Sequence, residues 1–289
     1  MTDDPFVTHR SLLFTVAYEM LGSAADAEDV VQETWLRWEP IDRDEIVDPR
    51  AYLVRIVTRQ ALNRLRTLRR RREDYVGEWL PEPLLTTPDI AEDVELAESV
   101  SIAMLTVLET LKPHERAVFV LKEVFDFPYE DIAAAVEKSP AAVRQIAHRA
   151  REHVAARRPR IEVDRAEQER VVAQFMTAIE SGDIQLLLNV LAPDVVIVAD
   201  GGGEVGAALR PIRGPKTVAR LLSRFRSFVP DAVVVPMHVN GMPGTRIELD
   251  GALDTVISLV VENGRVSRIY SIRNPRKLAR VSAAAALTR

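Results

Sequence analysis

The chain has 289 residues, a formal net charge of −5, 47% hydrophobic and 28% charged residues, and no cysteine. This length suits two or three globular domains, and the lack of cysteine excludes disulfide bonds and cysteine-ligated metals. The five histidines show no ligand spacing, so we expect no metal or other cofactor. The first residues lack a signal-peptide pattern, and polar residues interrupt the longest apolar run. We therefore expect a cytoplasmic protein with no membrane span.

Residues 6–38 predict two helices. Gly22 ends the first, and Ser23 is a suitable N-cap for the second. One face of the second helix is apolar and the other is polar. The polar face consists of Asp26, Glu28, Asp29, Gln32 and Glu33. Acids in the first turn of a helix also complement the helix dipole, which alone could explain Asp26 and Glu28. The alternative is that the polar face is a protein-docking surface.

Charge is sorted sharply in the next two stretches. Residues 49–72 contain nine arginines and no acidic residue, whereas residues 73–111 contain ten acidic residues and no Lys or Arg. The spacing of apolar residues in 49–72 predicts an amphipathic helix. Because the stretch 49–72 itself contains no acid that could pair with these arginines, nucleic-acid phosphate is a better partner for them than neighbouring side chains of the same helix.

Residues 74–98 predict an acidic linker with turn-prone prolines. The linker contains the segment Trp79-Leu80-Pro81-Glu82-Pro83, and an apolar pair is unusual in such a setting. Trp79 and Leu80 either anchor the linker on a neighbouring domain or belong to a segment that follows the path of a single-stranded nucleic acid, with the acids imitating its charge.

Residues 99–160 predict helices that end in a helix-turn-helix. Ser139 is an N-cap and Pro140 a first helical residue, and an apolar face follows. The outer face offers side chains that can contact phosphates and base edges. They are Arg144, Gln145, His148 and Arg149. A generic helical hairpin is the alternative, but small residues at the crossing and the basic outer face argue against it.

Residues 164–289 predict helices at 164–181, 183–191 and 214–228 and strands at 195–199, 233–239, 245–261 and 265–273. Asn263-Gly264 predicts a type I′ hairpin turn between the last two strands. Helices followed by a curved antiparallel sheet indicate an α+β cone. An enzyme in this cone would use acids or a histidine, but no spacing pairs the candidates, and solvated strand ends explain them better. The candidates are Asp200, His238, Asp250 and Asp254.

The stretches 22–38 and 49–73 together resemble domain 2 of bacterial extracytoplasmic-function (ECF) sigma factors. The resemblance implies that the acidic helix (Asp26, Glu28, Asp29, Gln32, Glu33) contacts the β′ clamp of RNA polymerase core. It also implies that the loop 39–48 and the basic helix recognise and open the −10 promoter element. Opening needs a base held outside the stack, which suggests a pocket in that loop. The implied promoter contacts are Asn63, Arg64, Arg66, Arg69 and Arg70.

The helix-turn-helix resembles domain 4 of the same family, which reads the −35 element, and the C-terminal part resembles SnoaL-like, NTF2-like domains. Three segments look like signatures of the ECF41 group of sigma factors, with Glu204 where that group has Lys and Arg276 where it has Asp. The segments are WLPEP (Trp79, Leu80, Pro81), DGGGEV (Asp200, Gly201, Gly202, Gly203) and NPRKL (Asn274, Pro275, Leu278). The resemblance implies an interaction domain that regulates the sigma portion in cis, without a separate anti-sigma factor, and a cone open to an unidentified small ligand.

We therefore expect two all-α sigma domains and an α+β NTF2-like cone, divided as 1–73, 74–98 (linker), 99–160 and 164–289. The predicted function is a sigma factor, not an enzyme, whose partners are the β′ and β subunits of polymerase core and promoter DNA. One alternative is a ligand-responsive helix-turn-helix regulator that acts without polymerase. Another is an enzyme fused to a DNA-binding module.

Overall fold

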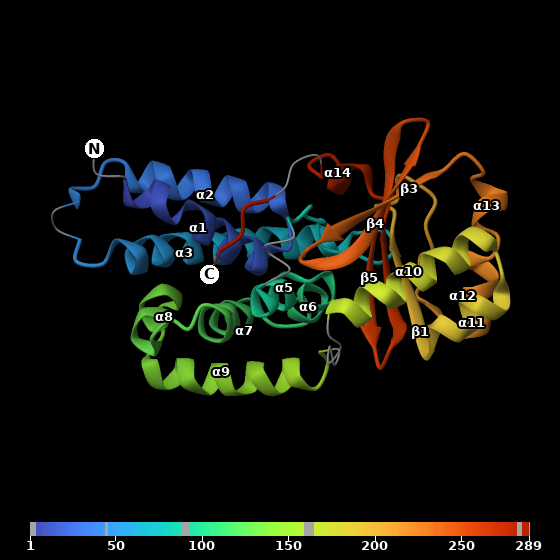
Figure 1. Cartoon of the computed structure of the whole chain (residues 1–289). Helices are drawn as coiled ribbons and strands as arrows, with labels where there is room; N and C mark the ends of the chain where they lie inside the picture. Colours follow the sequence, from blue (N-terminus) through green and yellow to red (C-terminus); the bar gives the residue numbers. More distant parts are fainter. Residues whose placement is uncertain (1–3, 44–45, 88–92, 159–164, 282–284, 289) are drawn as a thin grey trace.

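The computed structural model describes residues 4–43, 46–87, 93–158, 165–281 and 285–288, and for residues 69–73 and 165 it describes the backbone alone. Helices form the half of the molecule that contains the N-terminus, and a twisted sheet with its own helices forms the other half (Figure 1). The predicted combination of helical domains and an α+β NTF2-like cone is confirmed.

The first domain packs α1 (Pro5–Leu21), α2 (Ala24–Trp38) and α3 (Pro49–Glu73) against each other. Gly22 takes a left-handed conformation with φ 66°, which ends α1, and the Ser23 hydroxyl accepts a hydrogen bond from the Asp26 amide. Both signals act as the sequence predicted. The apolar sides of the helices meet in a dry core that contains Trp38 and Leu53.

The second domain contains α5 (Val94–Val100), α6 (Ile102–Leu108), α7 (Pro113–Phe119), a π-helical turn (Val120–Val124), α8 (Tyr129–Val136) and α9 (Pro140–Ala155). Helix α5 begins inside the stretch predicted as linker, because the Asp93 carboxylate caps it by accepting from the Leu96 amide. The apolar residues around Val100 and Met104 are divided between two helices, since Ser101 ends α5 and caps α6.

The predicted helix-turn-helix is present as α8 and α9. Glu137 takes the left-handed conformation at the turn (φ 55°), and the Ser139 hydroxyl accepts from the Ala142 amide at the start of α9. The apolar face of α9, with Val143 and Ile146, is buried.

The described residues of the C-terminal domain form a six-stranded sheet in the order β2-β1-β6-β5-β4-β3. Its elements are α10 (Arg165–Ser181), α11 (Ile184–Val190), β1 (Leu191–Asp200), β2 (Ile212–Arg213), α12 (Pro215–Leu222), α13 (Phe225–Phe228), β3 (Val233–Val239), β4 (Met242–Leu249), β5 (Ala252–Glu262), β6 (Arg265–Ile272) and α14 (Pro275–Leu278). Helices α10 to α13 lie together beside the sheet, and α14 lies apart from them, toward the helical half (Figure 1).

Three predictions about this domain are wrong. The sheet is mixed, because β1 runs parallel to β6. The strand predicted at 245–261 is two strands, β4 and β5, joined by Asp250 and Gly251 with φ 52° and 77°, the positive values of a type I′ turn. The helix predicted at 214–228 is likewise two, α12 and α13. The Asn263-Gly264 hairpin is confirmed, with φ 51° and 69°.

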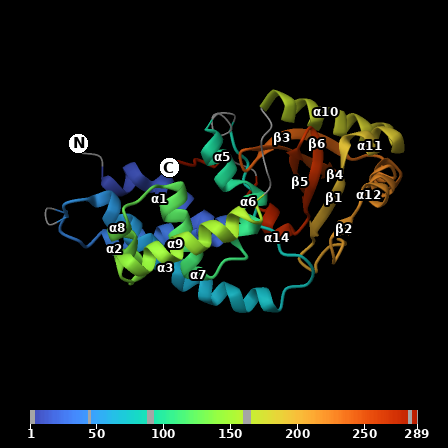
Figure 2. The ribbon, with the colours of Figure 1, turned by 90° about the horizontal axis from the view of Figure 1, so that it is seen from below.

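The three domains pack against each other through buried surface and are not joined by linkers alone. Residues of α1 to α9 belong to one apolar cluster, which also takes in Leu84 of the linker and Leu287 near the C-terminus. A second cluster joins Leu80 of the linker and Ile102 of α6 to the outer side of the sheet. The view from below shows α3 reaching toward the C-terminal domain, where the linker begins (Figure 2).

Candidate nucleic-acid interface and interdomain clamp

The acidic face of α2 is partly occupied within the molecule. The Arg64 guanidinium of α3 lies 3.3 Å from Asp26, 3.5 Å from Asp29 and 3.0 Å from Glu33. Glu28 pairs with Arg10 of α1 at 2.6 Å. Asp29 and Glu33 nevertheless remain exposed, and so does the predicted contact Gln32. Arg64 therefore ties α3 to α2, which the sequence did not indicate because its acidic partners are on another helix.

The side of α3 that is predicted to contact the promoter is divided between solvent and the helix-turn-helix. Asn63 and Arg66 are exposed and lie 3.3 Å apart, whereas Arg59 donates to the Ala134 carbonyl of α8 at 2.9 Å and lies 3.4 Å from Glu137. Helix α3 thus touches the helix-turn-helix directly. The side chains of the predicted contacts Arg69 and Arg70 lie outside the described residues.

The loop predicted to hold a flipped base ends beside a hollow of about 330 Å³. Ile46, Val47 and Asp48 line it on one side, and α8 closes it with Asp131 and Ala134. In this arrangement the hollow is shared between domain 2 and domain 4.

The recognition face of α9 is exposed. Arg144, Gln145, His148 and Arg149 all face away from the buried side of the helix. Arg144 lies 3.3 Å from Glu130 of α8, an exposed ion pair of the kind that contributes little to stability. The positions are those of a helix that can enter a DNA groove.

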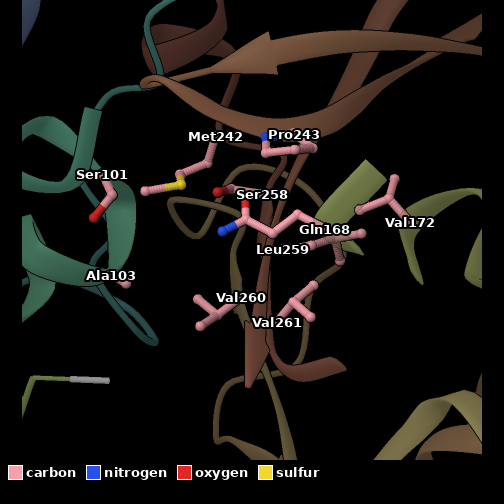
Figure 3. Close-up of a pocket in the computed structure, with 10 residues that line it drawn as sticks. All are labelled: Ser101, Ala103, Gln168, Val172, Met242, Pro243, Ser258, Leu259, Val260 and Val261. Atoms are coloured by element: carbon pink, nitrogen blue, oxygen red, sulfur yellow. The ribbon is translucent and has the colours of Figure 1, made fainter. Parts of the chain in front are cut away.

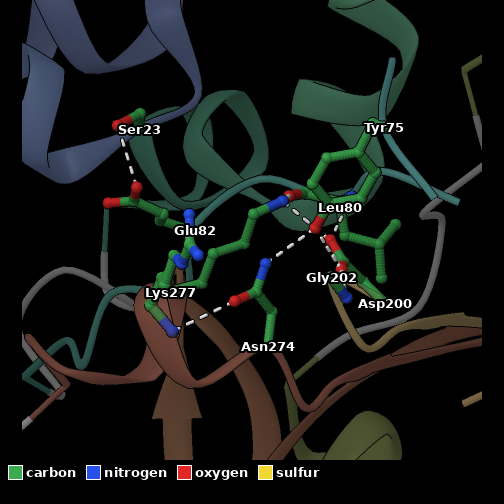
Figure 4. A network of polar contacts seen from close by, with 9 residues as sticks. Ser23, Tyr75, Leu80, Glu82, Asp200, Gly202, Asn274 and Lys277 are labelled. Carbon is green, nitrogen blue, oxygen red and sulfur yellow. Dashed lines mark hydrogen bonds and ion pairs between the residues drawn. The ribbon is translucent and has the colours of Figure 1, made fainter. Parts of the chain in front are cut away.

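Asp200, at the end of β1, is the centre of a buried polar network that holds the linker (Figure 4). Its carboxylate accepts from the Tyr75 hydroxyl at 2.5 Å, from the Leu80 amide at 2.8 Å and from Lys277 at 2.7 Å. Asn274 also donates to the Tyr75 hydroxyl, at 2.7 Å. Hydrogen bonding to Asp200 follows burial as a cause of the raised Tyr75 pKa.

Lys277 is enclosed as thoroughly as its partner. Its ammonium lies 4.0 Å from the centre of the Trp79 ring and also donates to the Leu80 carbonyl. Leu80 is fully buried among residues of α6 and the sheet. Trp79 and Leu80 lie against the C-terminal domain in this structure, as the anchor interpretation expects. The description of Asp200 as a solvated strand end is wrong, because Asp200 is fully buried.

The glycine loop fits this network closely. Gly202 and Gly203 have φ 64° and 73°, and a Cβ on Gly202 would overlap the Asn274 side chain. The Gly202 amide also donates to Asp200 at 3.0 Å. The two residues that reverse the charges of the ECF41 pattern face each other, since Arg276 lies 2.5 Å from Glu204.

Asn240, which the sequence did not single out, joins four parts of the chain. Its side chain donates to the Tyr18 hydroxyl of α1 at 2.7 Å and to the Val100 carbonyl of α5 at 2.8 Å. The same side chain accepts from the Leu84 amide of the linker at 2.8 Å, and its own amide donates to the Leu84 carbonyl. Asn240 is fully buried in the turn between β3 and β4.

The linker completes its anchorage with Glu82 and Leu85. The Glu82 carboxylate accepts from Ser23 at 2.9 Å and from the Ala25 amide at 3.1 Å, so it caps the N-terminus of α2. Leu85 forms an antiparallel bridge with Val239 of β3. We call the contacts of residues 75–86 with Asp200, Asn240, Asn274 and Lys277 the linker clamp.

Figure 3 shows where domain 4 meets the cone, with Ser101 and Ala103 of domain 4 facing Met242 of β4 and Ser258 of β5. The hollow between them measures about 10 Å³, roughly the room that one water molecule needs. This seam is a packed contact and not a ligand site.

A buried carboxyl group lies between domains 2 and 4. Glu19 of α1 accepts from Ser99 of α5 at 2.8 Å, and Arg116 of α7 donates to the Glu19 carbonyl, also at 2.8 Å. Burial raises the pKa of Glu19 to about 8, against the opposing effects of Ser99 and Arg116. Its other carboxyl oxygen has no partner among the described residues.

The residues considered for an enzyme do not converge. Asp250 is exposed in a turn, Asp200 is committed to the clamp, and Asp254 forms an ion pair with Arg273 at 2.8 Å. No group of His, Asp or Glu in the described ranges is placed to hold a metal ion. Nor does any helix in those ranges have the length and apolar character needed to cross a bilayer.

Comparison with known proteins agrees with this arrangement. Residues 6–71 match the sigma-70 region 2 family and residues 101–154 match sigma-70 region 4, so the helical half has the modules of a bacterial transcription initiation factor. Over 94% of its length the chain is 37% identical to ECF RNA polymerase sigma factor SigJ of Mycobacterium tuberculosis, covering 91% of that protein. It is 33% identical to the probable ECF sigma factor SigI of the same species, with 93% of this chain and 92% of that protein covered.

The crystal structure of Mycobacterium tuberculosis SigJ superposes with a TM-score of 0.77 at 35% identity, covering 95% of this chain and 97% of that one. The chain belongs to the ECF RNA polymerase sigma factors, which bind polymerase core and promoter DNA and direct transcription initiation. Its family is not one of enzymes, and the alternative of a regulator that acts without polymerase is not favoured.

Proposed function

We propose that this arrangement is a closed form of the sigma factor, which the C-terminal domain holds shut through the linker clamp and which opens when the factor joins polymerase on a promoter. The observation that carries the proposal is the direct contact between the −10 helix α3 and the −35 module, in which Arg59 reaches the Ala134 carbonyl and Glu137 of α8.

Promoter geometry requires these modules to separate. The −35 and −10 elements are about 25 base pairs apart, which corresponds to about 85 Å of duplex at about 3.4 Å per base pair. Domains whose DNA-binding helices touch each other cannot contact both elements at once. Recognition by Arg144, Gln145, His148 and Arg149 at −35 and by Asn63 and Arg66 at −10 therefore needs the open form.

The clamp opposes that separation. Asn240 bonds α1 of domain 2, the linker and α5 of domain 4 at the same time, and each bond lies in a dry interior where an unpaired polar group costs about 1–3 kcal/mol. Opening must break several of these bonds together. The C-terminal domain then takes the part that a separate anti-sigma factor plays elsewhere, and we expect none for this protein.

The predicted residue roles divide accordingly. Asp29, Gln32 and Glu33 are exposed on α2 and suit contact with the β′ clamp, while Asp26 and Glu28 are more enclosed. Arg64 serves first to hold α2 against α3. Because polymerase core and chromosomal promoters are in the cytoplasm, we expect the sigma factor to act there.

A reversible lock tests the proposal. Leu85 and Val239 are antiparallel bridge partners, whose Cα atoms lie within about 4.5–5.5 Å of each other, a spacing that a disulfide spans. Because the chain has no cysteine, Leu85→Cys with Val239→Cys creates a single disulfide. We expect the oxidised variant to lose core binding and abortive initiation, and the reduced variant to regain both.

The matched control is Val235→Cys with Arg246→Cys, a bridge between partner residues of β3 and β4 that leaves the linker free. Oxidation of this control should leave initiation unchanged. Equal initiation by the oxidised and reduced forms of the linker lock would refute the closed-form proposal.

A further inference from the structure

The cone encloses a cavity of about 390 Å³, inside the range of about 300–1,000 Å³ that is usual for small-molecule sites. Its walls are mostly apolar, with Phe175 of α10, Leu222 of α12 and Ile257 of β5 among them. Phe228 of α13 also lines it and is 68% exposed, which places this residue at the rim.

Two hydroxyl groups in the wall have no hydrogen-bond partner among the residues that the structure describes. Thr245, Ile257 and Ser271 are paired in register across β4, β5 and β6, and all three line the cavity. No hydrogen bond joins the hydroxyl of Thr245 or Ser271 to any other described residue. Thr245 is 2% exposed and lies in the cavity wall, so what little surface it shows belongs to the cavity.

The charged groups of the cavity are satisfied, in contrast. Arg273 donates to Asp254 through two nitrogens at 3.1 and 2.8 Å, and through the third to the Gly206 carbonyl at 2.6 Å. Thr255 completes the set by donating to Asp254 at 2.5 Å. A charged ligand would find no free counter-charge here, whereas a neutral one would find apolar walls and two hydroxyl groups.

The wall of the cavity is continuous with the linker clamp. Gly206, Ala207 and Ala208 line the cavity and follow the glycine loop directly. The Arg273 amide donates to the Asp200 carbonyl at 2.7 Å, so the residue that closes the cavity also borders the centre of the clamp.

The glycine loop between the cavity and the clamp has little slack. A Cβ on Gly201 would lie 2.8 Å from the Ala207 side chain, which shows how closely the two sides of the loop approach. Ala207 of the cavity wall therefore lies directly against Gly201, the neighbour of Asp200.

We propose that the cone binds a neutral, largely apolar small molecule bearing hydroxyl or keto groups, and that its binding loosens the linker clamp. Thr245 and Ser271 select the polar groups, and the apolar walls take up the body of the molecule. The second half of this inference rests on the proposed closed form, while the first half does not.

Binding is tested with N-phenyl-1-naphthylamine, a neutral apolar dye that brightens in a dry site, added to the full chain. We expect saturable binding of one dye per chain. Ala208→Phe puts a large side chain into the cavity and should weaken dye binding at least about tenfold. About tenfold is the lower end of the discrimination that one methylene group produces in an apolar pocket. The adjacent Leu209→Phe is the control, because Leu209 is 62% exposed and does not line the cavity. Absent binding, or equal binding by both variants, would overturn the site.

Selectivity is tested by displacing the dye with 2-naphthol and with naphthalene. The wild-type chain should prefer 2-naphthol, and Thr245→Val with Ser271→Ala should lose that preference while still binding the dye. A preference that survives both substitutions contradicts the role of the two hydroxyl groups.

Coupling is tested by hydrogen exchange of residues 75–86 with and without the dye. We expect exchange to accelerate by about 5- to 150-fold, the usual range for coupled sites. Unchanged or slower exchange with the dye bound would refute the coupling. The disulfide lock separates the two proposals: if the lock permits initiation while the dye binds as described, the closed form fails and the ligand site stands.

Discussion

The ion pair between Asp200 and Lys277 offers the sharpest test of the clamp. Asp200 is fully buried, Lys277 is 7% exposed, and their charged atoms lie 2.7 Å apart. Asp200→Asn keeps the shape and leaves a buried ammonium without a counter-charge, which costs about 3–5 kcal/mol in comparable pairs. The Leu80 amide donates to this carboxylate and therefore reports the opening of the clamp directly.

Native-state hydrogen exchange at Leu80 measures that cost. Since each 1.4 kcal/mol is about tenfold, exchange at Leu80 in Asp200→Asn should accelerate by roughly two to three and a half orders of magnitude. Abortive initiation by the full-length variant with core polymerase should rise as well, because less free energy then holds the factor closed.

The neighbouring pair of Glu204 and Arg276 supplies the control. Arg276 is 83% exposed, and exposed pairs contribute about 0–1 kcal/mol, so Arg276→Ala should change exchange at Leu80 by less than about tenfold. If Asp200→Asn accelerates exchange no more than Arg276→Ala does, the buried pair is not what holds the linker.

Four further predictions concern other parts of the molecule. Burial raises the pKa of Glu19 to about 8 from 4.5, so the folded protein keeps a proton that the unfolded chain loses, and its stability falls as pH rises between these values. Glu19→Gln should therefore have the same melting temperature as the wild type at pH 4 and a higher one at pH 8.5. Arg64→Ala should destabilise the protein by about 1 kcal/mol, since its hydrogen bonds to charged groups of α2 are lost. Arg66→Ala, at an exposed position, should leave the melting temperature unchanged and weaken promoter binding by the initiating complex. The reverse pattern would contradict both assignments. Arg149→Ala should reduce the slope of log affinity against log salt for −35 DNA by about one if it contacts a phosphate. Leu287 is 4% exposed in the helical core, so Leu287→Ala should cost about 2–5 kcal/mol in urea unfolding.

The helix-turn-helix could be predicted because its signals are local. A helix of suitable length, a cap at Ser139 and a proline at Pro140 all lie within a few residues, and the structure has α8 and α9 where these signals put them. Burial of Val143 and Ile146 follows from helical spacing alone.

Charge was harder to interpret, because an arginine takes its partners from anywhere in the fold. The lack of acids along α3 favoured nucleic acid for every arginine in it. The structure shows Arg64 bound to three acids of α2 and Arg59 bound to α8. Exposed Arg66 still fits the original interpretation. Pairing across helices cannot be deduced from spacing within one helix.

One turn was missed, and the role of another was not predicted. Asp250-Gly251 is a strong hairpin signal, and it was overlooked because apolar residues continue on both sides of it. The Asn240-Gly241 turn also carries this signal, but its role in the clamp could not have been read from it. Asn240 bonds Tyr18, which lies 222 positions away in sequence, and only the packed fold brings the two together.

The β3–β4 turn brings the C-terminal domain into close contact with the helical half. Its left-handed residues, Asn240 and Gly241, let the chain approach α5 so closely that a Cβ on Gly241 would lie 2.7 Å from the Ala97 side chain. Since the cone belongs to the same chain as the domains that it contacts, its effective concentration at them is high, and individually modest contacts suffice to close the clamp that we propose. Modest contacts are also what reversible control requires, because polymerase must replace them with its own. A clamp made of buried hydrogen bonds to Asn240 and Asp200 can be both closed and reversible. Several hydrogen bonds hold it closed together, and the loss of one admits water, which weakens the others.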